Sequence, residues 1–112
     1  MKDGDILLTA LRQADGVIKD RPVLILRHMP PFGDLLVCGI STQLQQAAEL
    51  DELIGPGDSD FATSRLKATS LIRLGYLAVL PRKEFKGKIG NISRARHERL
   101  LTRLADFLRP KK

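Results

Sequence analysis

The sequence predicts a mainly β fold (α+β), in which a small curled sheet or barrel is closed by one amphipathic helix at the C-terminal end. Three observations lead to this prediction. Short aliphatic and β-branched runs alternate with turn residues as far as Ile92. Leucines then recur at helical spacing after Ser93. The length of 112 residues suits a single domain over 1–112 with a modest core.

The first part of the chain is expected to form three short strands. The first covers residues 6–8, and turn residues at 13–16 form the tip of the loop that follows. Residues 22–26 form an uninterrupted apolar run, and a strand tolerates proline at its first position, so a buried strand is predicted to start at Pro22. Residues 35–40 predict a second buried strand.

The middle of the chain gives weaker signals. Residues 44–49 are compatible with a helical turn, and glycines and a proline at 55–58 predict a loop. A further strand is predicted at 68–74, with a continuation at 76–80 after one glycine. Residues 88–92 are expected to be short and extended.

The C-terminal helix is the clearest element. Ser93 is a good N-cap, and Pro110 cannot continue a helix, so the helix is predicted over about 93–108. Its apolar residues recur on one face: Leu100, Leu101, Leu104, Phe107 and Leu108. Four arginines are expected on the other faces: Arg94, Arg96, Arg99 and Arg103.

The formal charge of +6 is unevenly distributed. Residues 1–56 carry five basic and eight acidic side chains, whereas residues 57–112 carry fourteen basic and five acidic ones. A basic half can bind phosphates by counterion release or an acidic protein, or it can be a solvated surface. Charge alone leaves these three interpretations open.

The composition argues against several classes of protein. Cys38 is the only cysteine, which excludes an internal disulfide and a cysteine-based zinc site, and the two histidines lie far apart. No apolar run approaches the roughly 20 residues of a membrane helix, and the polar start lacks a signal-peptide pattern. We therefore expect a cytoplasmic protein with no membrane association, no metal and no cofactor.

Arg21 is the first candidate for chemistry. It stands where a loop enters the predicted strand at 22–26. Arginine is always protonated, and its planar fork suits a phosphate. The alternative is a surface arginine that pairs with Asp20 or another acid.

Three polar residues at a strand exit are the second candidate. Ser41, Thr42 and Gln43 follow directly on the strand at 35–40, where their side chains can donate hydrogen bonds. The alternative is ordinary turn chemistry. No histidine lies nearby in sequence, so a Ser-His-Asp hydrolase has little support.

The remaining polar residues have simpler interpretations. Ser70 and Arg73 stand three apart in one strand, so they point to opposite faces and only one can serve a common site. His28 and His97 are expected in structural positions. Cys38, inside an apolar strand, is expected to be inert core packing.

Taken together, the segments occur in a familiar order. These are residues 4–6, 21–24, 40–43, 66–67 with 70–73, and 89–93 before the terminal helix. In this order and spacing the chain resembles the MazF/PemK family of toxin–antitoxin ribonucleases over nearly its whole length.

The resemblance implies an SH3-like β-barrel with a C-terminal helix, a homodimer, and metal-independent cleavage of single-stranded RNA. It implies an acidic antitoxin whose tail occupies the RNA groove, and contact with operator DNA only through that antitoxin. The family's functional arginine and hydroxyl fall on Arg21 and Ser41, which are the expected catalytic residues. Thr42 and Gln43 continue the same motif and are expected to bind RNA, and Arg73 falls where some PemK-like members use an arginine. From their charge, Arg65, Lys67, Lys86 and Lys88 are expected to add contacts to the RNA backbone.

The chain also departs from the family pattern. Its first loop is short, Gly75 stands where PemK-like members carry an acid, and Ala78 stands where MazF-like members often carry an arginine. Asp15 or Asp20 could serve as a general base, and the sequence leaves that choice open. Two other functions therefore stay open, a non-catalytic nucleic-acid-binding barrel and a structural module that docks an acidic protein.

Overall fold

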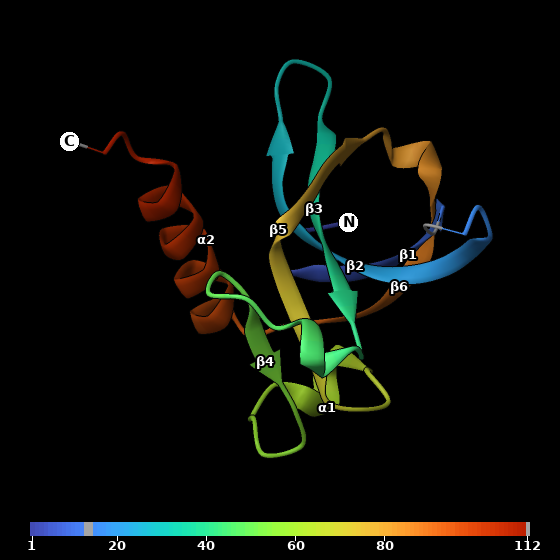
Figure 1. The fold of residues 1–112 in the computed structure, drawn as a ribbon. Coiled ribbons are helices and arrows are strands. Elements are labelled where there is room, and N and C mark those ends of the chain that lie inside the picture. Colours follow the sequence, from blue (N-terminus) through green and yellow to red (C-terminus); the bar gives the residue numbers. More distant parts are fainter. Residues whose placement is uncertain (13–14, 112) are drawn as a thin grey trace.

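The computed structural model describes residues 1–12 and 15–111, which form one six-stranded sheet with a C-terminal helix (Figure 1). The strands are β1 (Asp5–Arg12), β2 (Ile18–Met29), β3 (Asp34–Ser41), β4 (Glu52–Ile54), β5 (Ser70–Leu80) and β6 (Phe85–Asn91). Two short 3-10 turns, η1 (Leu44–Gln46) and η2 (Arg82–Glu84), and the helices α1 (Phe61–Ser64) and α2 (Arg94–Leu108) complete the fold. The prediction of a mainly β fold with a terminal helix is confirmed.

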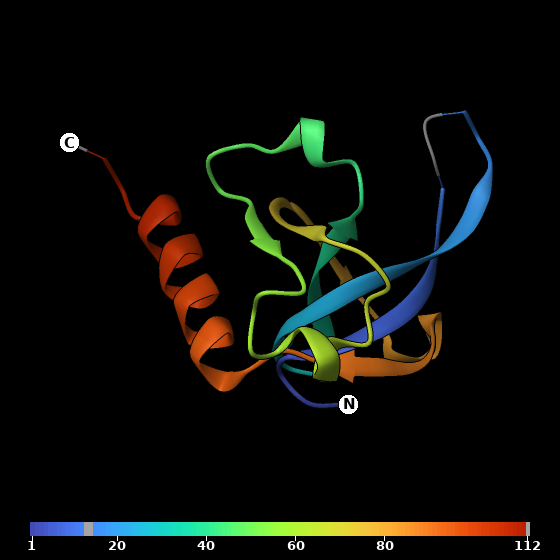
Figure 2. The same ribbon diagram turned by 90° about the horizontal axis from the view of Figure 1, so that it is seen from below.

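The strands lie in the order β4-β5-β3-β2-β1-β6, and every neighbouring pair is antiparallel. The sheet is strongly curled, with α2 beside it and the paired β1 and β2 extending away on the far side (Figure 2). β4 and β6 are its edges, and no ladder joins them within the described part of the chain. The sheet is therefore open, and the word barrel applies only loosely. None of the described helices is long and apolar enough to span a membrane.

The first two strands are longer than predicted. β1 continues to Arg12 and β2 begins at Ile18, so the prediction that this strand starts at Pro22 is wrong. Pro22 lies within β2, opposite Leu8 of β1, while the ladder with β3 begins only at Val23. Because β2 has a partner on one side only at this point, the missing N–H of proline is tolerated as it would be at a sheet edge.

β5 is one continuous strand, as the two neighbouring runs suggested, but it carries a bulge. Arg73 pairs with Gly39 and Leu77 pairs with Cys38, so residues 74–76 are extra in the ladder with β3. A bulge increases the local twist and redirects side chains. This irregularity lies next to the site described below.

Several short elements were not predicted. β4, α1 and η2 have only three or four residues each, too few to show a periodicity. The helical turn expected at 44–49 is limited to η1, and the strand expected at 88–92 is the end of the longer β6. The loop tip predicted at 13–16 falls in part on residues 13 and 14, which lie outside the described residues.

The sheet has two apolar faces. We call the one that α2 covers the helix face; its buried core includes Ile6, Leu24, Leu26, Cys38, Ile40, Ile72, Leu74, Leu100 and Leu104. The opposite face is lined by a second cluster, formed by Leu7, Val23, Ile25, Leu35, Val37 and Phe85, with Ala78 and Leu80 against it. The alternation of side chains along β2 and β3 places neighbouring residues in different clusters.

α2 begins and packs as its sequence predicts, with two exceptions. The Ser93 hydroxyl accepts a hydrogen bond from the Arg96 backbone N–H at 3.1 Å, which confirms the N-cap. Leu100 and Leu104 are buried. Phe107 and Leu108 were expected on the buried face but are exposed, because the helix extends beyond the part of the sheet that it covers.

The second exception is Arg96, which is buried rather than on an outer face. Its guanidinium donates two hydrogen bonds to Asp60, from Nε at 2.9 Å and from Nη2 at 3.1 Å. Its Nη1 donates to the Glu52 carboxylate at 2.7 Å and to the Leu53 carbonyl at 3.1 Å. Arg96 therefore ties α2 to β4 and to the start of α1.

The carboxylates around Arg96 have further partners. Glu52 also accepts hydrogen bonds from Arg99 and Arg103, and Asp60 accepts one from the Ser93 backbone N–H, all at 2.9 Å. Burial alone would raise the pKa of Asp60 and of Glu52, but the arginines' hydrogen bonds and charges outweigh burial and lower both pKa values. Both side chains are thus held ionised by the helix.

Replacing Arg96 by methionine would leave Asp60 and Glu52 buried without their shared partner. Breaking a buried ion pair by removing one member costs about 3–5 kcal/mol, so we expect Arg96→Met to lower the free energy of unfolding in urea by that amount. The matched control is Arg94→Met, because Arg94 is 93% exposed and pairs with Glu98 one turn along the same helix; its effect should stay below about 0.5 kcal/mol. Equal losses in the two variants would contradict this role for Arg96.

The same ion pairs predict how stability depends on pH. Asp60 and Glu52 have lowered pKa values in the folded chain, so their contribution is complete above the unfolded pKa of about 4 and is lost as pH falls through the lower folded values. Urea unfolding followed down this acidic range should show a decline that is shallower in Arg96→Met. Parallel declines in the two proteins would show that other carboxylates cause the acid sensitivity.

Candidate functional site

Arg21 lies in β2 opposite Thr9 of β1, and its side chain is exposed. Arg21, Val23 and Ile25 are every second residue of β2, so their side chains point to the same side of the strand. Arg21 therefore lies on the opposite face of the sheet, away from α2. The neighbouring Asp20 does not pair with it; the Asp20 carboxylate lies 2.8 Å from the Lys86 ammonium. The alternative that Arg21 is held by Asp20 is therefore wrong.

Ser41 is the last residue of β3 and lies on the same opposite face. Val23 pairs with Gly39, and two further steps of this register would place Ser41 across from Arg21, but the ladder ends where the two strands part. The Ser41 hydroxyl oxygen accepts a hydrogen bond from the Gln43 backbone N–H at 3.0 Å. Its own hydrogen remains available to a ligand.

Thr42 and Gln43 are exposed after the end of β3. The Gln43 side-chain oxygen accepts a hydrogen bond from Gln45 at 2.7 Å, within the same loop. The bond between Gln43 and Ser41 also shows that turn chemistry is present here. The sequence-based alternative of a polar turn is thus correct as local structure, and it holds the Ser41 oxygen in place.

Arg73 lies in β5, and its pairing with Gly39 of β3 places it on the same face of the sheet. Its guanidinium carbon lies 5.6 Å from the centre of the Tyr76 ring, a cation–π distance. Its Nε is buried and has no hydrogen-bond partner among the described residues. Ser70, three residues earlier, is buried and donates its hydroxyl to the Ala68 carbonyl at 2.8 Å, so Arg73 is the member of the pair on the site face.

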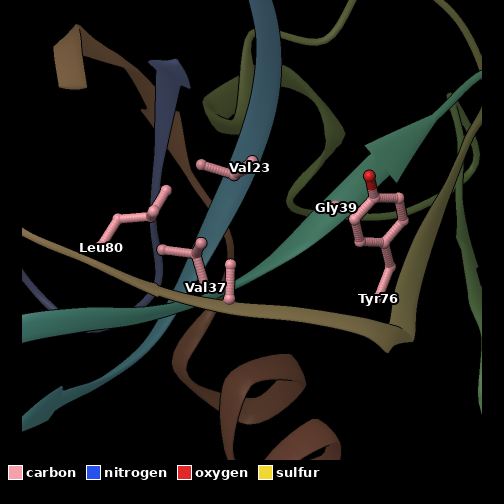
Figure 3. Close-up of a pocket in the computed structure, with 6 residues that line it drawn as sticks. Val23, Val37, Gly39, Tyr76 and Leu80 are labelled. Atoms are coloured by element: carbon pink, nitrogen blue, oxygen red, sulfur yellow. The ribbon is translucent and has the colours of Figure 1, made fainter. Parts of the chain in front are cut away.

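An apolar hollow opens beside these residues (Figure 3). The Val23, Val37 and Leu80 side chains gather at one end of it, and Tyr76 stands at its other end beside Gly39. Its six lining residues are Val23, Val37, Gly39, Tyr76, Ala78 and Leu80. Ala78 thus forms part of an apolar wall.

The other expected RNA-binding residues lie apart from this group. Arg65 and Lys67 are both exposed in the segment that joins α1 to β5. Arg65 ends α1 with a left-handed backbone at φ 61°. The structure therefore brings together Arg21, Ser41 and Arg73, but not Arg65 and Lys67.

The basic residues divide into two groups by their partners. Among the described residues, six arginines form ion pairs: Arg27, Arg94, Arg96, Arg99, Arg103 and Arg109. Lys86 and Lys88 pair with Asp20 and Asp5. Within the described ranges, Arg21, Arg65, Arg73 and Arg82 have no acidic partner. Of these, Arg21 and Arg73 carry their unpaired charge on the opposite face.

The other titratable groups have structural surroundings. His28 contacts Asp3 at 2.7 Å, and a ring nitrogen of His97 lies 2.9 Å from the Leu26 carbonyl oxygen. Burial raises the pKa of the Cys38 thiol to about 12, so it supplies no thiolate nucleophile near neutral pH. Asp20 projects to the face away from Arg21, which removes it as a base for this site. No three His, Cys, Asp or Glu side chains in the described segments are grouped so as to hold a metal ion.

Sequence reasoning missed Tyr76. It is the only tyrosine in the chain, and 47% of it is exposed although it lies in a strand. Its neighbour Gly75 could have signalled a bulge that redirects it. Tyr76 and Gly39 lie far apart in the sequence, on different strands, so their contact could not be predicted from the sequence.

Comparison with known proteins gives one clear match. The family model for the PemK-like, MazF-like toxin of type II toxin–antitoxin systems matches residues 2–108. None of the curated proteins matches the sequence. The matched range includes every strand of the sheet and the whole of α2.

Proposed function

The chain belongs to the PemK-like, MazF-like toxin family of type II toxin–antitoxin systems, and we propose that it acts as an endoribonuclease that cleaves single-stranded RNA without a metal ion. Membership of this family implies an antitoxin as its partner. The proposed active site is formed by Arg21 and Ser41, with Arg73 beside them. RNA contacts extend to Thr42 and Gln43 at the end of β3 and to Arg65 and Lys67 further away.

One observation supports this function most. Arg21 and Arg73, which have no acidic partner in the part of the chain that the structure describes, share a sheet face with the hydroxyl hydrogen of Ser41. Unpaired guanidinium groups on an exposed sheet face are suited to phosphate oxygens, which accept two parallel hydrogen bonds from one arginine. The face therefore fits an RNA backbone better than a neutral ligand.

The proposed reaction uses the RNA as its own nucleophile. The ribose 2′-oxygen attacks the adjacent phosphorus and loses its proton, and the bond to the 5′-oxygen of the next nucleotide breaks. That 5′-oxygen takes up a proton, which leaves a 2′,3′-cyclic phosphate and a 5′-hydroxyl. Negative charge grows on the phosphate oxygens in the transition state, where Arg21 and Ser41 donate hydrogen bonds.

Cleavage of a long RNA in EDTA tests the proposal. Arg21→Ala should lower the rate by about 10²–10³, the usual cost of losing one preorganised donor. Arg21→Lys should restore little, since an ammonium lacks the planar fork. Ser41→Ala should also be slower, and the product should carry 2′,3′-cyclic phosphate ends.

Arg27→Ala is the matched control, because Arg27 is an exposed arginine in the same strand that pairs with Asp3. It should cleave as fast as the unchanged protein. Intact RNA at high protein concentration, with binding still measurable, would instead support the non-catalytic RNA-binding barrel. Cleavage that is unaffected by changing both Arg21 and Ser41 would refute the site.

A homodimer is the second part of the proposal. On the helix face, Leu77 and Val79 of β5 are 40% and 51% exposed, and Phe107 and Leu108 at the end of α2 are 53% and 66% exposed. Exposed apolar side chains such as these two pairs are candidates for an interaction surface. A second copy of the chain would remove these side chains from water and leave the opposite face free for RNA or for the acidic tail of an antitoxin.

Sedimentation should accordingly give twice the chain mass of 12.5 kDa. Val79→Glu and Phe107→Glu should yield folded monomers, because a charge buried in an apolar interface is costly. Phe32→Glu is the control: Phe32 is 85% exposed in the turn between β2 and β3, and its variant should remain dimeric. A monomer of the unchanged chain at micromolar concentration would disprove the dimer.

A further inference from the structure

Thr9 is a buried polar residue on a face of the sheet whose other buried side chains are apolar. It is 2% exposed, and it follows Leu7 by two residues along β1, so its side chain lies on the opposite face with that of Arg21. Its hydroxyl donates a hydrogen bond at 2.8 Å to the backbone carbonyl of Glu84, which is 75 residues away in sequence. Valine has the same branched shape, so packing alone does not require a hydroxyl here.

Thr9 stands where the sheet narrows locally from three strands to two. It pairs with Arg21 of β2 on one side and with Phe85, the first residue of β6, on the other. Beyond this row, residues 10–12 and 18–20 form a two-stranded arm that extends away from the sheet (Figure 2), with no third strand beside it among the described residues. Burial along β2 changes at the same place, since residues 18–21 are exposed and residues 23–26 are buried. Thr9 therefore lies at the root of the arm.

The position of Arg21 depends on this root. The ladder between β2 and β3 begins only at Val23, so the Arg21 backbone is held in the sheet through β1 alone. β1 is held at this row by its pairing with Phe85 and by the hydrogen bond from Thr9 to Glu84. A loosened root would therefore let the guanidinium move.

The arm has a second side-chain contact with β6, which is weaker. The Asp20 carboxylate lies 2.8 Å from the Lys86 ammonium, but these side chains are 45% and 57% exposed. Exposed ion pairs of this kind contribute little, because water and salt compete for both charges. The Thr9 hydrogen bond is shielded from water and is the firmer tie.

We propose that Thr9 is a positioning residue for the proposed cleavage reaction. Its hydrogen bond to Glu84 fixes the root of the arm, and the root sets where the Arg21 guanidinium meets the phosphate. This inference rests on the proposed nuclease activity, to which Thr9 contributes through Arg21 without touching the RNA. A displacement of about 1 Å in such a group can cost about 10² in rate, so a buried bond on the neighbouring strand is enough to matter.

Amide hydrogen exchange tests the anchoring in the absence of RNA. Thr9→Val keeps the shape of the side chain and removes the hydroxyl, so the protected amides of residues 18–21 should exchange faster, while those of residues 35–40 stay unchanged. Thr9→Ser keeps the hydroxyl and should retain slow exchange. The matched control is Ser70→Ala, because Ser70 is also 2% exposed and donates its hydroxyl to a backbone carbonyl at 2.8 Å, but in β5. It should leave the arm unchanged.

Cleavage kinetics test whether the anchor acts through Arg21. Thr9→Val should lower kcat by roughly 10- to 100-fold and change KM much less, and Thr9→Ser should cleave almost as fast as the unchanged protein. In the Thr9→Val background, Arg21→Ala should cost far less than the factor of about 10²–10³ expected in the unchanged protein, because the guanidinium is already displaced. Ser70→Ala should cleave at the unchanged rate.

The outcomes distinguish this proposal from the proposed nuclease activity. Losses from Thr9→Val and Arg21→Ala that simply multiply would overturn the positioning role and leave the nuclease intact, as would unchanged exchange of the arm in Thr9→Val. Absence of cleavage by the unchanged protein would refute the nuclease, and the same variants are then compared by their affinity for a 2′-O-methyl RNA strand. Overlapping affinity losses with faster exchange of the arm would still support Thr9 as the anchor of Arg21, whereas independent losses would overturn it.

Discussion

The buried ion pairs of Arg96 organise both the fold and the charge of this protein. Arg96 joins α2 to Asp60 and Glu52, which are 36 and 44 residues away in sequence, and Glu52 also binds Arg99 and Arg103. These contacts fix the helix on one face of the sheet. They also pair three of the basic side chains of the C-terminal half, Arg96, Arg99 and Arg103, with carboxylates.

The two faces of the sheet therefore differ in whether their arginines are paired with carboxylates. The arginines of the helix face are committed to carboxylates, while Arg21 and Arg73 on the opposite face keep their charge unpaired among the described residues. β2 and β3 part beyond Val23 and Gly39, and the bulge of β5 turns Tyr76 toward the space beside them. Positive charge and a hydroxyl donor thus share one surface with a small apolar hollow, and the charge and the donor suit the proposed contact with an RNA backbone.

Local signals predicted local structure well. The Ser93 cap and the Leu100 and Leu104 spacing gave α2, and the apolar runs gave β2, β3 and β5, because capping and periodicity depend on near neighbours. Contacts between residues far apart in the sequence could not be predicted from these local signals. The burial of Arg96 depends on distant carboxylates, and the packing of Tyr76 depends on a glycine in another strand. Family resemblance supplied Arg21 and Ser41, whose individual sequence signals were weak.

The account claims that RNA lies on the sheet face opposite α2. Titrating the isotope-labelled protein with a non-cleavable 2′-O-methyl RNA, and following its backbone amide signals by NMR, tests this claim most directly. The account predicts that the largest shifts fall on Arg21 and Val23, on residues 39–43, and on residues 71–76. Shifts concentrated along α2, at Arg94 and Arg99, with an unchanged opposite face would contradict it.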